Sequence, residues 1–257
     1  MSKGIPAGAQ LLTLPIDACV ITAGYKNQLY AKQFGFGHFG VDMVSADGAK
    51  TVYALGDGEV IAAGLDGTAG DYSGLGWVTV IRYDNVYIPG QNRVADLIAT
   101  TMHHVPGSLL VAAGDQVTAG SAIGDYGNTG GTKVNGGPMA PHLHLQFDTD
   151  VNYPLYCSGI SGKGSRILRR GTSDSTVNPY HVLTRYETQA QTCRDRKDGW
   201  AEDWDKLPTY ESIIGEPQGA DREELERLTA QLEAAEARAG KAEATIANIK
   251  ALIEKHN

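Results

Sequence analysis

Histidines are concentrated in three short segments of this 257-residue chain. Five of the seven lie in Gly37–Asp42, Met102–Val105 and Pro141–Leu145. A zinc ion that performs hydrolysis is held by three protein ligands of nitrogen or oxygen type and keeps one coordination position open. Imidazole and carboxylate groups can supply those ligands, so the three segments are the candidates for a hydrolytic metal site.

The spacing within two of these segments indicates how the side chains point. In a β-strand, residues i and i+2 share a face, so His142 and His144 point one way while the leucines between and after them turn to the core. His38 and Asp42 are four residues apart in glycine-rich sequence, which disfavours a helix. We expect His38 in a loop and Asp42 where a strand begins. Spacing alone leaves two interpretations open: a metal site, or ordinary surface and core histidines.

The elements around these segments are predicted to be strands. From about residue 10 to 150, short runs rich in β-branched and aromatic residues alternate with Gly, Asp and Asn, as in Trp77–Tyr83 after Gly76. The chain has 32 glycines, typical of many turns. No stretch with helical periodicity competes, so this part is predicted to be all β.

The C-terminal part has a different pattern. After an irregular stretch from 151 to about 218, apolar residues recur at steps of three and four, and we predict a helix with Asp221 as its N-cap. It either packs on its own domain or forms an oligomerising coiled coil through 221–255. The apolar positions are Leu225, Leu228, Leu232, Ala235, Ala239, Ala242, Ile246, Ile249 and Ile253. We therefore predict a domain over 1–185, a linker or extension over 186–218, and a helical segment over 219–257.

Charge and hydropathy exclude several classes of protein. The net charge of -8 argues against a nucleic-acid binder. No run reaches the roughly 18 apolar residues of a membrane helix, so no membrane insertion is expected. The N-terminus, Met1–Pro6, is broken by Gly and Pro and does not read as a signal peptide. We expect synthesis in the cytosol without a signal peptide.

In their order along the chain, the motifs resemble those of the M23 (lysostaphin-like) family of zinc metallopeptidases. His38–Asp42 fits the family's HxGxD motif, and Pro141–Leu145 fits its HLH motif. The segments Val52–Val60, Gly114–Gly120 and Ile123–Gly130 fit the strands and hairpins between them. The resemblance covers about residues 20 to 150. It departs from the family at Met102, where an aromatic residue is usual.

The resemblance implies a mainly β, two-layer antiparallel β-sheet domain with an open groove and one zinc ion per chain. It implies His38, Asp42 and His144 as zinc ligands, and His142 with one middle histidine as catalytic residues. The family's middle motif favours His104 for that place. His103 would then lie at the surface or behind the site, because adjacent strand residues face opposite sides.

The function that the resemblance implies is hydrolysis of peptide bonds in bacterial peptidoglycan, which leads to cell-wall lysis. Without a signal peptide, a bacteriophage endolysin or virion-associated lysin fits, and a secreted enzyme trimmed of its signal is the competitor. Two alternatives from other classes stay open: a non-catalytic M23-like binding or activator module, and a structural phage-tail protein. The bond that is cut is not evident from the sequence.

Overall fold

The computed structural model describes residues 4–66, 74–131, 138–152, 154–155, 160, 173–189, 194–195, 204–215 and 227. The chain divides into two units, Met1–Ile214 and Gly215–Asn257, of which the first carries all the named elements. Apart from Arg227, the predicted C-terminal helix and coiled coil lie outside the described residues. The predicted boundaries at 185 and 218 stay predictions. No helix in the described part is long and apolar enough to cross a membrane.

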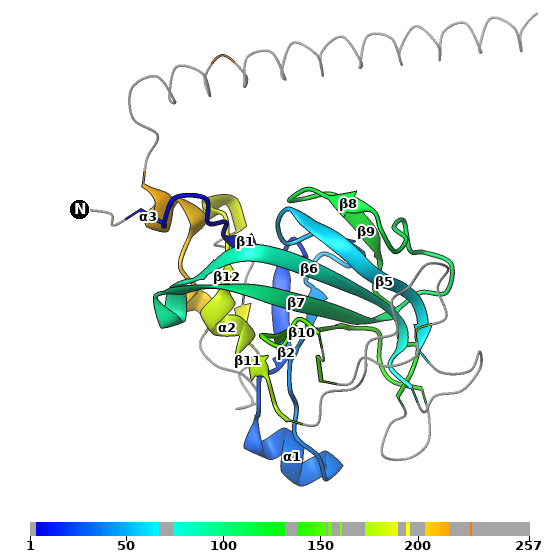
Figure 1. Cartoon of the computed structure of the whole chain (residues 1–257). Coiled ribbons are helices and arrows are strands. Elements are labelled where there is room, and N and C mark those ends of the chain that lie inside the picture. Colours follow the sequence, from blue (N-terminus) through cyan, green and yellow to red (C-terminus); the bar gives the residue numbers. More distant parts are fainter. Residues whose placement is uncertain are drawn as a thin grey trace, which may run out of the picture. The chain divides into compact units, whose positions relative to one another are not determined.

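A large sheet forms the body of the first unit (Figure 1). Its strands pair in the order β13–β2–β3–β10–β7–β6–β5–β8, with β11 also beside β10. All pairs are antiparallel except β13 with β2. The bounds are β2 Cys19–Ala23, β3 Val41–Ser45, β5 Gly58–Asp66, β6 Gly76–Ile88, β7 Arg93–His104, β8 Gln116–Val117, β10 Leu143–Asp148, β11 Thr176–Val177 and β13 Arg194–Asp195. The predicted mainly β, antiparallel architecture is confirmed.

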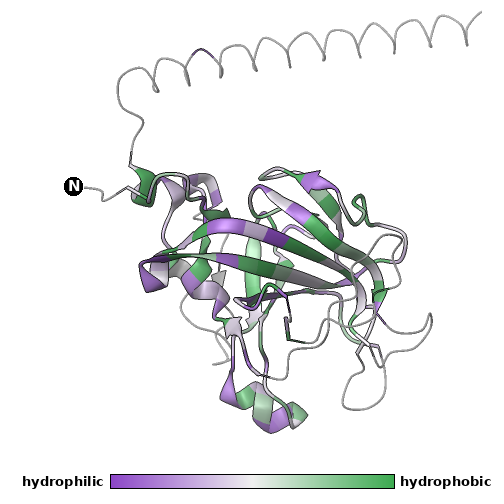
Figure 2. Cartoon of the chain, in the orientation of Figure 1, coloured by the Kyte–Doolittle hydropathy of each residue, from purple (hydrophilic) through white to green (hydrophobic). Residues whose placement is uncertain are grey.

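Two small sheets accompany the large one. One pairs β4 (Thr51–Tyr53) with β9 (Ala122–Asp125) in antiparallel fashion, and the other pairs β1 (Leu12–Thr13) with β12 (Leu183–Thr184) in parallel. The main apolar cluster joins residues of the large sheet to Val52 and Ile123 of the small sheet. A second apolar cluster contains other side chains of the large sheet, among them Val78 and Met102. Hydrophobic and hydrophilic residues both occur along β6 and β7, as Figure 2 shows.

Short helices complete the unit. They are α1 (Gln28–Phe34), α2 (Pro179–Val182), α3 (Tyr210–Ile214) and three 3₁₀ turns at Pro89–Gln91, Glu187–Gln189 and Trp204–Lys206. The helix α1 interrupts a region predicted to be all β. It begins because the Asn27 side chain accepts hydrogen bonds from the first free N–H groups, and it ends at Gly35 with φ 80°.

An irregularity near the end of β7 sets the direction of two histidines. Thr79 pairs with Thr101 and Trp77 pairs with His104. Between these two pairs, β7 advances by three residues while β6 advances by two. The extra residue makes a β-bulge, and His103 adopts a left-handed φ of 68° within it. Beyond the bulge, the alternation of side chains along β7 is shifted by one residue.

Candidate metal centre

Three potential metal ligands converge at the junction of β3 and β10. Asp42 on β3 is paired directly with His144 on β10, and His38 lies in the loop between α1 and β3. Asp42 Oδ1 is 3.0 Å from His38 Nε2 and 2.9 Å from His144 Nδ1, and the two histidine nitrogens are 3.1 Å apart. The three residues thus present one ligand atom each to a single point, as the sequence predicted.

This donor set fits a zinc ion. Two imidazole nitrogens and one carboxylate oxygen are the number and type of ligands in a catalytic zinc site, and a tetrahedral ion would separate such atoms by about 3.4 Å. His38 Nδ1 donates a hydrogen bond to the Gly24 carbonyl oxygen at 2.8 Å. That bond leaves the lone pair of His38 Nε2 directed at the centre, which is how residues outside a coordination sphere orient a ligand.

A glycine between the first two ligands makes room for the third. A Cβ atom on Gly40 would lie 2.4 Å from the Leu145 carbonyl oxygen and 2.5 Å from His144 Nε2. Both contacts are closer than side chains tolerate, so only glycine lets this loop pack against β10. The HxGxD spacing therefore has a steric basis in this chain.

The centre is buried, and the charge of Asp42 and the neighbouring histidines affect one another's pKa values. Burial opposes ionisation of Asp42, yet the neighbouring His38, His142 and His144 outweigh it and hold the pKa of Asp42 well below its usual value. Burial lowers the pKa of His144, although Asp42 partly offsets this effect. Both shifts favour an ionised Asp42 carboxylate beside a neutral His144 imidazole, which is the protonation state that binds a metal cation.

An aromatic residue that the sequence did not single out supports the first ligand. The Tyr30 ring of α1 stacks on the His38 ring with centroids 4.4 Å apart and an interplanar angle of 24°. Burial, and then the Asp42 charge, raise the pKa of Tyr30, so its hydroxyl stays protonated at neutral pH. In the sequence, the only indication of this contact was an aromatic residue eight positions before His38. That indication could be used only if the helix α1, which carries Tyr30, had been predicted.

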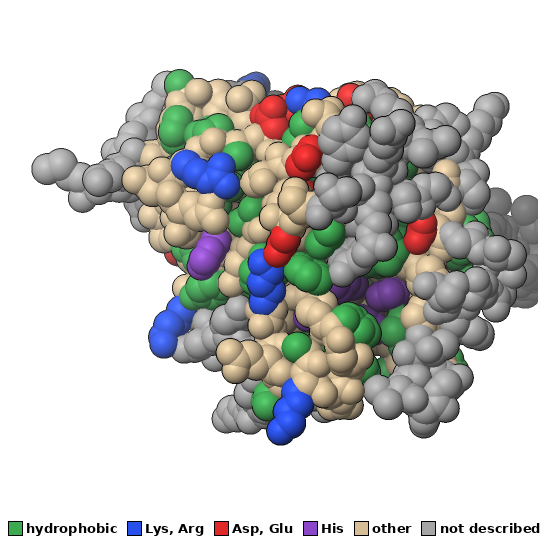
Figure 3. All heavy atoms as spheres, turned by 60° about the horizontal axis from the view of Figure 1, so that its bottom comes forward, with side chains coloured by type: hydrophobic (Ala, Val, Ile, Leu, Met, Phe, Trp, Pro, Cys, Tyr) green, Lys and Arg blue, Asp and Glu red, His purple; other side chains and the backbone are tan. Residues whose placement is uncertain are grey.

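Two further histidines lie beside the trio. His142 Nε2 is 3.8 Å from Asp42 Oδ1, and its Nδ1 donates to the Ala140 carbonyl oxygen at 2.7 Å. The His103 ring is 4.9 Å from the His142 ring and 6.1 Å from the His144 ring, measured between centroids. Histidine side chains reach the surface in a hollow bordered by hydrophobic side chains, as Figure 3 shows.

The structure therefore places His103 beside the trio, where the sequence favoured His104, and the catalytic role of either histidine stays a prediction. His104 Nδ1 donates to the Asp125 carbonyl oxygen at 3.2 Å, and its Nε2 accepts from the Thr101 hydroxyl at 2.8 Å. His104 is thus fully buried, with both ring nitrogens engaged, on the face of β7 that carries Thr101. The bulge explains why His103 takes the place expected for His104, because it adds one residue to β7 between Thr101 and His104.

Protonation of the two middle histidines is disfavoured. Burial, followed by the nearby His142 and His144, lowers the pKa of His103 to about 3. Burial lowers the pKa of His104 to about 4, although the Asp125 carbonyl partly opposes this shift. Both rings are neutral at pH 7. His103 Nδ1 donates to the Thr129 carbonyl oxygen at 2.8 Å, so its Nε2 is the proton acceptor.

The buried His104 predicts a pH dependence of stability. Below its ordinary pKa of 6.5 the unfolded chain binds a proton that the folded protein accepts only near pH 4. Stability therefore declines as pH falls through this window, by about 2 kcal/mol between pH 7 and pH 5. Urea unfolding in EDTA, which removes any effect of metal loss, measures this decline. His104→Gln should show a shallower dependence, and equal slopes would contradict the assignment.

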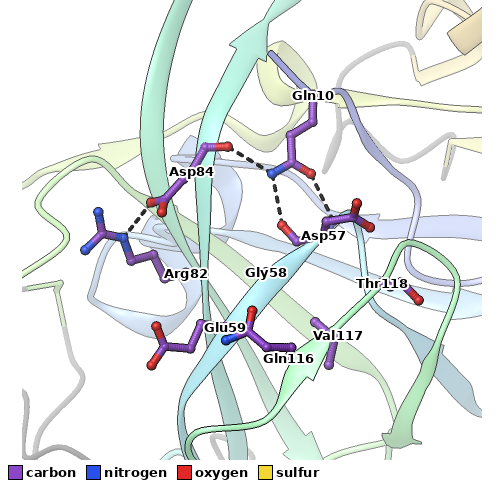
Figure 4. Close-up of a pocket in the computed structure, with 9 residues that line it drawn as sticks. All are labelled: Gln10, Asp57, Gly58, Glu59, Arg82, Asp84, Gln116, Val117 and Thr118. Atoms are coloured by element: carbon purple, nitrogen blue, oxygen red, sulfur yellow. Dashed lines mark hydrogen bonds and ion pairs between the residues drawn. The ribbon is translucent and has the colours of Figure 1, made fainter. Parts of the chain in front are cut away.

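A separate polar pocket lies away from the centre. It has a volume of about 360 Å³ and is lined by Gln10, Asp57, Gly58, Glu59, Arg82, Asp84, Gln116, Val117 and Thr118. Its polar groups bond to one another: the Gln10 amide bridges the backbones of Asp57 and Asp84, and Arg82 pairs with Asp84 (Figure 4). None of its lining residues belongs to the histidine cluster, and we assign it no chemistry.

Comparison with known proteins gives one family. Residues 36–154 match the model of peptidase family M23, and no curated protein matches the chain. Similar solved structures include a zinc-containing peptidase from Vibrio cholerae (24% identity, TM-score 0.38), the catalytic domain of lysostaphin from Staphylococcus simulans (22%, 0.37) and the catalytic domain of a prophage-encoded M23 protein from Enterococcus faecalis (21%, 0.39).

The extent of these structural matches differs among the three. They cover 54%, 62% and 63% of this chain, and 37%, 87% and 88% of the other chains, respectively. The matched part therefore spans little more than a third of the Vibrio peptidase. At these TM-scores, the conclusions about the centre rest on the family match and on the geometry of the residues themselves.

Proposed function

We propose that the protein is a zinc-dependent endopeptidase that hydrolyses peptide bonds of bacterial peptidoglycan, since its residues 36–154 match the model of peptidase family M23. The observation that carries the proposal is the convergence of His38, Asp42 and His144 on one point, with His142 and His103 beside them. A metal-binding trio alone would suit a structural site. Two additional histidines next to it suit proton transfer.

The chemistry divides between the ion and the side chains. His38, Asp42 and His144 would hold a zinc ion, whose Lewis acidity would polarise the scissile carbonyl and make a water molecule more acidic. His103 and His142 each donate from Nδ1 to a backbone carbonyl, so each presents Nε2 towards the reaction. One of them would accept the proton of the attacking water on Nε2, and that same proton would then be donated to the oxyanion or to the leaving amine.

Asp42 acts as a ligand in this proposal and not as the base. Its Oδ1 atom lies 3.0 Å from His38 Nε2 and 2.9 Å from His144 Nδ1, at the point where the ion would bind, and its pKa is held well below its usual value. A carboxylate of such low basicity is a poor proton acceptor near neutral pH. The role of base therefore falls to a histidine.

The biological setting of the enzyme is a separate part of the proposal. A phage-encoded lysin that reaches the wall after release, or as part of the virion, stays the setting that we propose from the sequence. Oligomerisation through 221–255 stays a prediction that falls outside the described residues. The rival function, a non-catalytic wall-binding or activator module, requires a centre that lacks part of its machinery. Here all three ligands and two neighbouring histidines are in place.

A chelation experiment tests the proposed function. We expect the zinc-loaded protein to lower the turbidity of purified bacterial walls, 1,10-phenanthroline to stop this, and added zinc to restore it. Several wall types are needed because the bond is unknown. Lysozyme in the same chelator serves as the control that the walls remain digestible. Binding to walls without release of fragments from any of them would favour the rival module.

A further inference from the structure

We propose that Thr129 is a positioning residue for His103, and that it acts by holding the bulge in β7 that turns His103 towards the metal centre. The inference rests on the proposed function for its catalytic consequence. The geometry behind it is independent of that function, because it concerns how one loop residue completes the hydrogen bonds of two strands.

The bulge creates a need for a hydrogen-bonding partner. An extra residue in one strand interrupts the ladder and leaves backbone groups without their usual partners. At this point His103 has φ 68°, a conformation that residues with side chains rarely adopt unless the surroundings enforce it. Something outside the two strands must therefore hold the backbone near Trp77 and His104, the pair that follows the bulge.

The Thr129 hydroxyl supplies that partner. Its Oγ1 accepts a hydrogen bond from the Trp77 backbone N–H at 3.0 Å and donates one to the His104 carbonyl oxygen at 2.8 Å. Trp77 and His104 are paired residues of β6 and β7. The hydroxyl thus bridges both strands at the irregular end of the ladder, and it needs both its donor and its acceptor capacity to do so.

The backbone of the same residue orients the imidazole. The Thr129 carbonyl oxygen accepts from His103 Nδ1 at 2.8 Å. Because a carbonyl can only accept, this bond places the proton on Nδ1 and leaves Nε2 as the acceptor. Thr129 therefore determines the direction of the ring through its carbonyl and the direction of the backbone through its hydroxyl.

The neighbouring loop links this arrangement to the second catalytic histidine. The Gly127 N–H donates to the His103 carbonyl oxygen at 2.7 Å, and the Gly127 carbonyl accepts from the His142 N–H at 2.9 Å. The same short segment thus contacts the backbones of both histidines that face the centre. A shift of this segment would change their separation.

The loop that carries Thr129 packs closely against the start of β6, and this packing depends on two glycines. A Cβ atom on Gly76 would lie 2.4 Å from Thr129 Oγ1, and one on Gly130 would lie 2.4 Å from the Gly76 nitrogen. Both glycines also have left-handed φ values, 76° and 73°. Two glycines therefore permit the approach that brings the Thr129 hydroxyl between the strands.

The test compares Thr129→Val, which keeps the shape but removes both hydroxyl bonds, with Thr129→Ser, which keeps the hydroxyl. Full-length zinc-loaded protein is used throughout. We expect Val to lower kcat on solubilised wall fragments roughly 10- to 100-fold, because misplacement by about 1 Å can cost that much. KM and zinc content should stay within about threefold of wild type. Ser should restore most of kcat.

A readout besides activity follows the ring itself. In wild type, ¹⁵N correlation spectra should show a proton on His103 Nδ1, and in Thr129→Val this signature should weaken towards a tautomer mixture. Thr118→Val is the matched control, since it removes an exposed hydroxyl that bonds only to Ser121 among the described contacts. It should change neither kcat nor the spectrum.

The outcomes separate the inference from the proposed function. Unchanged kcat and an unchanged His103 signature in Thr129→Val would overturn the inference. A lost signature in a protein whose wild type digests no wall would support the positioning and overturn the function. If Thr129→Val does not fold, Thr129→Ala removes the same hydroxyl with less bulk and is judged by the same two measurements.

Discussion

We expect His144→Ala to lose its metal and its activity on walls together. The variant removes one of the three proposed ligand atoms, and altering a residue that only orients a ligand already weakens metal binding roughly 10- to 100-fold. We expect zinc affinity to fall by more than about 100-fold. A Lewis acid contributes several kcal/mol to such a reaction, so hydrolysis should fall roughly 1000-fold or more. Zinc content by mass spectrometry and fragment release from walls measure the two effects.

A matched substitution separates this result from general damage. His181→Ala removes a half-buried histidine of α2 that lies outside the centre, and it should keep both zinc and activity. Circular dichroism should show that His144→Ala remains folded, because Asp42 still contacts His38. Retained stoichiometric zinc in folded His144→Ala would contradict the assignment of the trio.

The second large effect is expected for His103→Ala, which should keep zinc and lose activity. Among the described contacts, His103 has no hydrogen bond or ion pair to the trio, and its ring centroid is 6.1 Å from that of His144, so the metal should stay bound. Positioned acids and bases contribute roughly 100- to 10,000-fold to rate, and we expect a loss of kcat in that range. Steady-state kinetics with zinc-loaded protein measure it, with metal content determined on the same samples.

The neighbouring histidine provides a sharp contrast. His104 points away from the centre, with both nitrogens bonded to Thr101 and Asp125. His104→Gln should be less stable but should keep kcat per folded molecule within about threefold, because it touches no reacting group. The reverse pattern would be an active His103→Ala and a folded but inactive His104→Gln. That result would assign the catalytic role to His104, as the family motif predicted, and not to His103.

Much of the site could be predicted from the sequence, because local rules are sufficient for it. The alternation of residues placed His144 of β10 on the same side as His142, which directly precedes the strand, and turned Leu143 and Leu145 to the core, where both are fully buried. Gly40 indicated close packing, and the loop position of His38 and the start of β3 near Asp42 followed from the glycine-rich sequence. The ordered resemblance added that these segments meet.

The choice between His103 and His104 could not be made from the sequence, because it depends on a long-range pairing. Regular alternation predicts that only one of the two histidines faces the centre. A single bulge shifts the alternation by one residue and so changes which of them it is. The bulge lies in the pairing of β7 with β6, at the end of the ladder where the Thr129 hydroxyl bonds to both strands. Neither contact has a local signature.

Two other contributors were missed for a related reason. Tyr30 reaches His38 from α1, a seven-residue helix inside a region that reads as strands and turns. Its Asn27 and Gly35 caps resemble ordinary turn residues in sequence. Thr129 lies in a loop, where a hydroxyl gives no indication of the two strands that it will bridge.

The measurement that tests the central claim most directly is mass spectrometry of the material released from purified walls by the zinc-loaded protein. The predicted result is fragments with new amino termini at one type of peptide bond, formed with zinc and absent both with chelator and with His144→Ala. Fragments that arise by cleavage of glycosidic bonds, or release that continues unchanged in chelator, would contradict a zinc endopeptidase centred on His38, Asp42 and His144.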